Sequence, residues 1–187
     1  MNTTLLVTVI AVVVAALGAV ALYLNYRSRR LRSRFGPEYA RAVEESGNRY
    51  RAEAKLEQLE KRVAKLSIQP LSREAAGRFR DSWRAVQAQF VDDPRTALNN
   101  ADRLLGEVMS ARGYPVADFE ERAEEISVHH APVVDHYRAG HEIAVRHAQG
   151  RATTEDMRLA MIHYRTLFED LVGAPETVRV RSAGNSR

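Results

Sequence analysis

Five of the chain's six histidines lie in one stretch, from His129 to His147. Imidazole binds transition metals and titrates near neutral pH, so this stretch is the first candidate for chemistry. Pro132 predicts that a helix begins inside it. On a helix that turns about 100° per residue, His136 and His141 point about 140° apart. A metal ion needs ligands about 2 Å from one point, which this spacing does not provide.

Two known metal-binding patterns also fail in this stretch. His141-Glu142 begins like the zinc-protease motif, but Val145 occupies the position of the second histidine. No glutamate is followed three residues later by a histidine, as the di-iron bundle pattern requires. His136 and His147 share a helix face but lie about 16 Å apart along it. We predict structural roles for the histidines and no cofactor; the alternative is a metal-dependent enzyme or regulator that uses His136, His141 and Glu142.

The composition limits the other kinds of chemistry. The chain has no cysteine, which excludes disulfides, thiolate zinc sites and cysteine nucleophiles. The glycine-rich phosphate loops and the G-x-S-x-G nucleophile turn are missing. Residues 1–34 carry five arginines and no acid, whereas the rest of the chain has 23 basic and 24 acidic residues. Because this body is close to neutral, we expect no nucleic-acid partner, and we predict a protein that is not an enzyme.

The strongest functional signal is at the N-terminus. The run from Leu5 to Leu24, LLVTVIAVVVAALGAVALYL, carries no charge and is about 30 Å long as a helix, the thickness of a bilayer core. Arginines follow it directly, which predicts an N-terminus outside and a body in the cytoplasm. We expect a transmembrane anchor at 1–26 and a basic juxtamembrane segment at 27–36. The lipid bilayer is the expected partner, and the candidate membrane-surface residues are Tyr23, Tyr26, Arg27, Arg29, Arg30, Arg32 and Arg34.

A cleaved signal peptide is the competing interpretation of the same segment. Ala19-Val20-Ala21 fits a cleavage site, and the chain would then be a secreted helical protein. A signal peptide, however, carries its positive charge before the apolar run, whereas here the charge follows it. In a retained anchor, Ala11, Ala15 and Ala19 form a row of small residues that makes a homodimer possible.

The rest of the chain has helical periodicity throughout. Residues 37–69 contain an amphipathic helix and a linker, with a weak point at Gly47-Asn48. The apolar positions of this helix, Ala52, Leu56, Leu59, Val63 and Leu66, have heptad spacing over only about two heptads. The helix therefore packs on its own domain or, alternatively, forms a self-associating stalk.

Residues 70–173 contain repeated signals for helix starts and stops. Ser72, Asp93 and Thr153 are typical N-cap residues, and Pro94 and Pro132 suit first helical turns. Asp118 with Glu121 resembles a capping box. Trp83 lies on an apolar stripe at helical spacing, which favours a core position over a base-stacking surface. We predict an all-α fold with a transmembrane helix, a helical stalk and a bundle of about five or six helices, followed by a disordered basic tail at 174–187.

Four segments carry a resemblance to a known family. They are FGPEYARAV from Phe35, WRAVQAQFVDDP from Trp83, ADRLLGEVMSARGYPVADFEERA from Ala101 and AMIHYRTLFEDLV from Ala160. Together they resemble an uncharacterised family of single-pass membrane proteins from actinobacteria, often labelled membrane or secreted proteins. The resemblance implies an anchored helical domain and no particular activity. The chain departs from the family at His129, where the family has an acid.

These features together favour a membrane-anchored binding or scaffold module. A body without a recognisable catalytic motif and with a basic segment beside an apolar helix is suited to holding a partner at a membrane surface. We therefore expect an unidentified protein partner in the cytoplasm.

Overall fold

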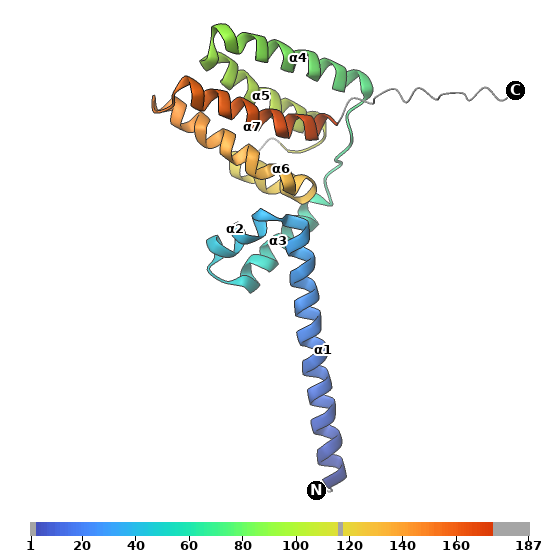
Figure 1. Ribbon diagram of the computed structural model, residues 1–187. Helices are drawn as coiled ribbons and strands as arrows, with labels where there is room; N and C mark the ends of the chain where they lie inside the picture. The colour runs from blue at the N-terminus through green and yellow to red at the C-terminus, as the bar shows by residue number, and fades with distance from the viewer. Residues whose placement is uncertain (1–2, 116–117, 174–187) are drawn as a thin grey trace, which may run out of the picture. The chain divides into compact units, whose positions relative to one another are not determined.

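The computed structural model describes residues 3–115 and 118–173 of the chain, and every regular element in these ranges is an α-helix. This confirms the predicted all-α fold. Figure 1 shows the helices in chain order. The predicted tail at 174–187 lies outside the described residues. The helices are α1 (Thr3–Phe35), α2 (Pro37–Ser46), α3 (Arg49–Val63), α4 (Arg73–Asp92), α5 (Pro94–Ala111), α6 (Phe119–Ala148) and α7 (Thr154–Val172).

Helix α1 contains both the apolar run and the arginines. The large apolar side chains of the run are exposed, and within the described residues α1 is the one helix long and apolar enough to cross a membrane. The arginine segment is not a separate element, because the helix continues through it to Phe35. Gly36, with a φ of 51°, then turns the chain, and Pro37 opens α2.

The chain divides into two compact units. The first comprises residues Met1–Ile68 and Gly113–Arg138, and the second comprises Gln69–Arg112 and Ala139–Arg187. The break after Ile68 lies beside the domain boundary expected at residue 69. The segment Gly113–Arg138, however, belongs to the first unit, although the sequence placed it in the same bundle as residues 70–112. Contacts between distant helices decided this division.

The first unit has its own core between α1, α2, α3 and α6. The single helix expected at 37–66 is two helices, because Gly47 adopts a φ of 59° and Asn48 caps α3 by accepting hydrogen bonds from the backbone N–H groups of Tyr50 and Arg51. The heptad positions of α3 are buried against this unit, which confirms packing within the chain. The buried core residues are Leu31, Phe35, Tyr39, Ala42, Ala52, Leu56, Leu59, Val63 and Val128.

Helix α6 is bent back at His130, whose φ of −126° and ψ of 31° are not helical. In a straight helix, residues 120 and 138 would be about 27 Å apart. Instead, Arg138 Nη1 donates a hydrogen bond to Glu120 Oε2 at 2.5 Å. Pro132 explains the bend, because it has no N–H to donate to the carbonyl of Val128. The helix start predicted at Pro132 is thus the second arm of a bent helix.

The second unit contains α4, α5, α7 and the end of α6. The predicted caps are confirmed, since Ser72, Asp93 and Thr153 each accept a hydrogen bond from a backbone N–H in the first turn of the following helix. Trp83 of α4 is 5% exposed and stacks on Phe168 of α7, with ring centroids 4.7 Å apart. The prediction that Trp83 anchors the core is therefore confirmed.

Candidate functional site

The arginines at the end of α1 form ion pairs with acids of α3. Arg27 Nε donates to Glu57 Oε1 at 2.5 Å. Arg30 Nη2 lies 2.5 Å from Glu60 Oε2, and Arg34 Nε lies 3.1 Å from Glu60 Oε1. These pairs run along neighbouring helices, so they fix α3 beside the last three turns of α1. Three of the five predicted membrane-surface arginines thus also hold the first unit together.

A buried carboxylate lies at the centre of this contact. The side chain of Glu53 is 2% exposed and accepts hydrogen bonds from Ser28 Oγ, Tyr39 Oη and Arg49 Nε, the last two at 2.9 Å. Burial raises the pKa of Glu53, but the hydrogen bonds outweigh this effect, so the pKa lies below its ordinary value. Glu53 therefore stays ionised and links α1, α2 and α3.

The remaining predicted residues differ in how they are placed. The guanidinium of Arg32 lies over the ring of Tyr39, 5.2 Å from its centroid. Arg29 is exposed. Tyr23 and Tyr26 are 64% and 70% exposed, so their rings are free to contact a lipid interface.

Sequence reasoning missed the acids that pair with these arginines. Glu53, Glu57 and Glu60 follow one another at spacings of four and three, which places them on one face of α3. Two of the arginines they bind, Arg27 and Arg30, are also three residues apart. Matching acidic and basic stripes on two neighbouring amphipathic helices were the signal that could have predicted the pairing.

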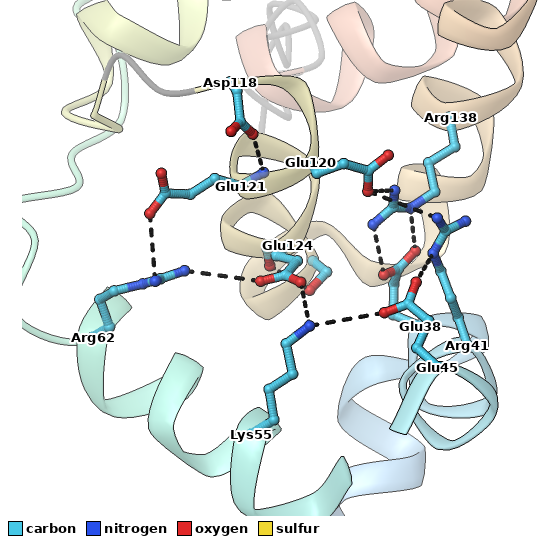
Figure 2. Close-up of polar contacts among 11 residues, drawn as sticks. Glu38, Arg41, Glu45, Lys55, Arg62, Asp118, Glu120, Glu121, Glu124 and Arg138 are labelled. Carbon is cyan, nitrogen blue, oxygen red and sulfur yellow. Dashed lines mark hydrogen bonds and ion pairs between the residues drawn. The ribbon is translucent and has the colours of Figure 1, made fainter. Parts of the chain in front are cut away.

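A second charged cluster joins both arms of α6 to α2 and α3 (Figure 2). Arg138 is its centre: Nε and Nη2 donate to the two carboxylate oxygens of Glu38 at 2.7 and 3.1 Å. The side chains of Arg138 and Glu38 are only 11% and 7% exposed. Burial lowers the pKa of Arg138, but the hydrogen bonds to Glu38 and Glu120 raise it further, and the net pKa lies above its ordinary value. This two-oxygen contact is the geometry in which an arginine–carboxylate pair is strongest.

The rest of the cluster is more exposed and lies between α3 and α6. Lys55 Nζ donates to Glu124 Oε1 at 2.6 Å and lies 3.8 Å from Glu45 Oε2. Arg62 pairs with Glu121 at 3.4 Å, and Figure 2 shows it reaching toward Glu124 as well. Pairs of this kind contribute less than about 1 kcal/mol each, so their main effect is to select the register of the two helices.

Glu125 differs from the other carboxylates of this cluster, which form close ion pairs. Its side chain is 2% exposed, its nearest cation is Arg62 Nε at 3.6 Å, and Oε2 has no hydrogen-bond partner among the described residues. Burial raises the pKa of Glu125, and the charge of Arg62 only partly opposes this. The negative form of Glu125 is therefore poorly stabilised.

The histidines are distributed over both units. His130 is 9% exposed at the bend of α6, with its ring 6.5 Å from that of Tyr114. His136 and His141 lie farther along α6 and are partly buried, as predicted for His141. Within residues 3–115 and 118–173, no group of three or more histidine or acidic side chains is arranged to hold a metal ion. His136 and His141 point about 140° apart around the axis of α6, so their rings do not converge on one point.

The second unit contains a pocket of about 700 Å³ between α4 and α7. Its apolar wall includes the stacked pair Trp83 and Phe168. Its polar lining carries both charges and consists of Arg80, Arg84, Gln87, Arg165, Glu169 and Asp170. The pocket has the size and the mixture of aromatic and polar groups that are typical of ligand and peptide sites. It is the candidate contact site of the second unit.

Three features of the chain bear on its function: the exposed apolar part of α1, the arginine–glutamate pairs and the α4–α7 pocket. The first is typical of membrane anchors, the second of a rigid connection to the following domain, and the third of a binding site. The resemblance to the actinobacterial membrane family stays a prediction from the sequence, because comparison of the chain with models of protein families, with curated proteins and with solved structures finds no match.

Proposed function

We propose that the chain is a single-pass membrane protein whose helical body faces the cytoplasm and holds a partner near the bilayer, without catalysis. The observation that carries the proposal is the exposure of α1. In its first twenty or so residues, apolar side chains are exposed on every face of the helix, with exposed fractions of 57% for Leu5 and 72% for Leu22. A helix that is apolar all round is stable in lipid and costly in water.

The orientation in the proposal is supported by the arginines. Residues 1–4 contain no Lys or Arg, and Arg27 to Arg34 follow the apolar run within about three turns. Charge on one side of a span keeps that side in the cytoplasm during insertion. Ion pairing with α3 forms only after folding, so it leaves this signal available during insertion.

The scaffold role is supported by the continuity of α1. The helix leaves the apolar run and enters the core of the first unit without a break, since Leu31 and Phe35 are both fully buried. The first unit is therefore attached to the anchor by a rigid helix rather than by a flexible linker. A body held in this way stays close to the membrane surface.

A pair of topology reporters tests the anchor and its orientation. We expect a reporter that works only in the cytoplasm to be active when fused after Gly173. Replacing the five arginines with glutamine and adding lysines at Asn2 and Thr3 should lower that activity, because orientation follows the charge difference across the span. A silent cytoplasmic fusion together with an active external one would mean an inverted or cleaved anchor. Sequencing the mature N-terminus would then identify cleavage after Ala21.

The partner contact is tested at the α4–α7 pocket. Gln87 lines the pocket, whereas its neighbour Ala88 is exposed on another face of α4. A photoreactive residue at position 87 should crosslink a specific protein in native membranes, and one at position 88 should not. Equal products at both positions, or none at either, would contradict a partner site in this pocket.

A further inference from the structure

Tyr50 is an exposed aromatic residue outside the membrane-surface set that the sequence indicated. It lies in the first turn of α3, between Arg49 and Arg51, and 62% of its surface is exposed. An exposed tyrosine with arginines on both sides is a combination typical of a bilayer interface. Whether it can reach a bilayer depends on where α1 places it.

The register between α3 and α1 gives this position. Glu60 pairs with Arg30 and Arg34, Glu57 pairs with Arg27, and these contacts show that α3 runs in the same direction as α1. The first turn of α3 is therefore its part nearest to the apolar run. Figure 1 shows the α2–α3 hairpin beside the C-terminal part of α1.

One contact gives the depth of this turn. Arg49 Nε donates to Ser28 Oγ at 2.8 Å. Ser28 lies four residues beyond Leu24, the last residue of the apolar run, which is about 6 Å along the helix. The headgroup layer on each side of a bilayer is about 5 to 7 Å thick. With Leu24 at the edge of the hydrocarbon, the guanidinium of Arg49 lies within the headgroup layer.

We propose that the α2–α3 turn, residues 46–51, is a second membrane contact in which Tyr50 lies among the lipid headgroups and Arg49 and Arg51 bind their phosphates. The partner is a bilayer that contains anionic lipid. The inference rests on the proposed function, since α1 must cross the membrane to bring the turn to this depth.

The charges of the turn favour anionic lipid over a neutral surface. Arg51 is exposed, and Arg49 remains 49% exposed while it contacts Glu53. Glu45 is held by Arg41 at 2.9 Å. Glu44 is a second exposed acid at this end of α2, and its charge opposes the two arginines. The depth of the turn in the headgroup layer should therefore depend on the opposing charges of Arg51 and Glu44.

A second contact changes what the anchor does. One helix in a bilayer is free to rotate about its axis, so the first unit would have no fixed face toward the membrane. A turn that binds lipid on one side of α1 removes this rotation. The first unit then presents the same surface to the cytoplasm in every molecule.

Fluorescence quenching in liposomes measures the depth of the turn. The absence of cysteine allows single-cysteine variants of the full chain to carry an environment-sensitive fluorophore. The positions are Tyr50→Cys, Ala64→Cys directly after the end of α3 as a matched control about 21 Å away, and Leu17→Cys within the anchor. The quenchers are nitroxides on the lipid headgroup or in the acyl chain, in phosphatidylcholine with or without phosphatidylglycerol.

We expect the headgroup nitroxide to quench position 50 at least twofold more than position 64, and more strongly with phosphatidylglycerol than without it. Arg51→Glu should reduce this quenching, and Glu44→Gln should increase it. A variant with the fluorophore at Glu44→Cys, two residues before the turn, keeps the native ring of Tyr50. Adding Tyr50→Ala to this variant should lower the quenching of its fluorophore.

The fluorophore at position 17 distinguishes failure of the second membrane contact from failure of the membrane anchor. If the acyl-chain nitroxide quenches position 17 but position 50 behaves like position 64, the second contact is overturned while the anchor stands. If position 17 is not quenched, the proposed membrane anchor itself is wrong. Quenching at position 50 that is unchanged by phosphatidylglycerol and by Arg51→Glu would overturn the role of the arginines.

Discussion

Glu53 and Glu125 are both almost fully buried, but their surroundings act on their charge in opposite directions. Glu53 accepts three hydrogen bonds, one of them from an arginine, and its pKa lies below the ordinary value. Glu125 has one distant arginine, and burial raises its pKa. The number of donors that reach each carboxylate therefore decides whether its charge stabilises the fold.

Replacing each glutamate with glutamine should change the free energy of unfolding in opposite directions. At pH 7, Glu53→Gln should lower the free energy of unfolding by about 2 kcal/mol, because charge-assisted hydrogen bonds are lost. Glu125→Gln should raise it by about 1 kcal/mol, because a buried charge without adequate partners is removed. Urea unfolding of the full chain in detergent, followed by circular dichroism, measures both. Equal destabilisation by the two variants would contradict this account.

The pH dependence of these variants provides a separate measurement. The stabilisation from Glu53 is present above the ordinary glutamate pKa of about 4.3 and is lost as the pH falls toward its lower folded value. Glu125 has a raised pKa, so its contribution is present below about pH 4.3 and is lost as the pH rises through the folded value. We therefore expect Glu53→Gln to approach the wild-type stability in acid. The gain from Glu125→Gln should be largest at neutral pH and should shrink in acid.

At the scale of elements, a close helix contact depends on one glycine. A Cβ atom added to Gly140 of α6 would lie 2.6 Å from the ring of Tyr164, which is fully buried on α7. Both helices belong to the second unit, and the ring occupies the space that any other side chain would need. The contact is therefore a constraint on sequence that helix propensity alone does not explain.

Gly140→Ala should lower the free energy of unfolding by about 1 to 3 kcal/mol, because the ring of Tyr164 must move within a packed core. Gly77→Ala is the matched control, since Gly77 lies within α4 and an added Cβ would meet nothing within 4 Å. This control should stabilise the chain by about 0.5 to 1 kcal/mol through helix propensity. Thermal unfolding curves compare the two variants, and a neutral or stabilising Gly140→Ala would show that the helices separate without cost.

At the scale of the whole molecule, the chain has two cores that are built separately. The first is formed by α1, α2, α3 and α6 as far as Arg138, and the second by α4, α5, α7 and the rest of α6. Each core contains its own large buried side chains. Loss of one core is therefore expected to leave the other with most of its stabilising contacts.

Hydrogen exchange tests this independence. Trp83→Ala should destabilise the second unit by about 3 kcal/mol or more, because truncating a buried aromatic leaves a cavity beside Phe168. Amide protons of α4, α5 and α7 should then exchange faster, while those of α2 and α3 keep their protection. Leu56→Ala in the first unit is the reciprocal variant and should affect α2 and α3. Uniformly faster exchange in both variants would mean that the chain unfolds as one unit.

The sequence determined the features that depend on neighbouring residues. The apolar run of α1 is long enough to cross a bilayer by composition alone. The caps at Ser72, Asp93 and Thr153 form within one helical turn, so residue type and position were sufficient to predict them. The burial of Trp83 followed from its place on an apolar stripe.

Only the tertiary structure decided which helices meet. The pairing of Glu57 and Glu60 with the arginines of α1 depends on the register of two helices that are separated by about thirty residues. Pro132 bends α6, but the partners of its second arm are a tertiary feature, since Arg138 reaches Glu38 and Glu120 at once. Residues 113–138 accordingly belong to the first unit rather than to the predicted bundle. Local hydrogen bonds and periodicity set each helix, whereas packing and charge complementarity between distant helices set their arrangement, and a single sequence does not specify that complementarity in advance.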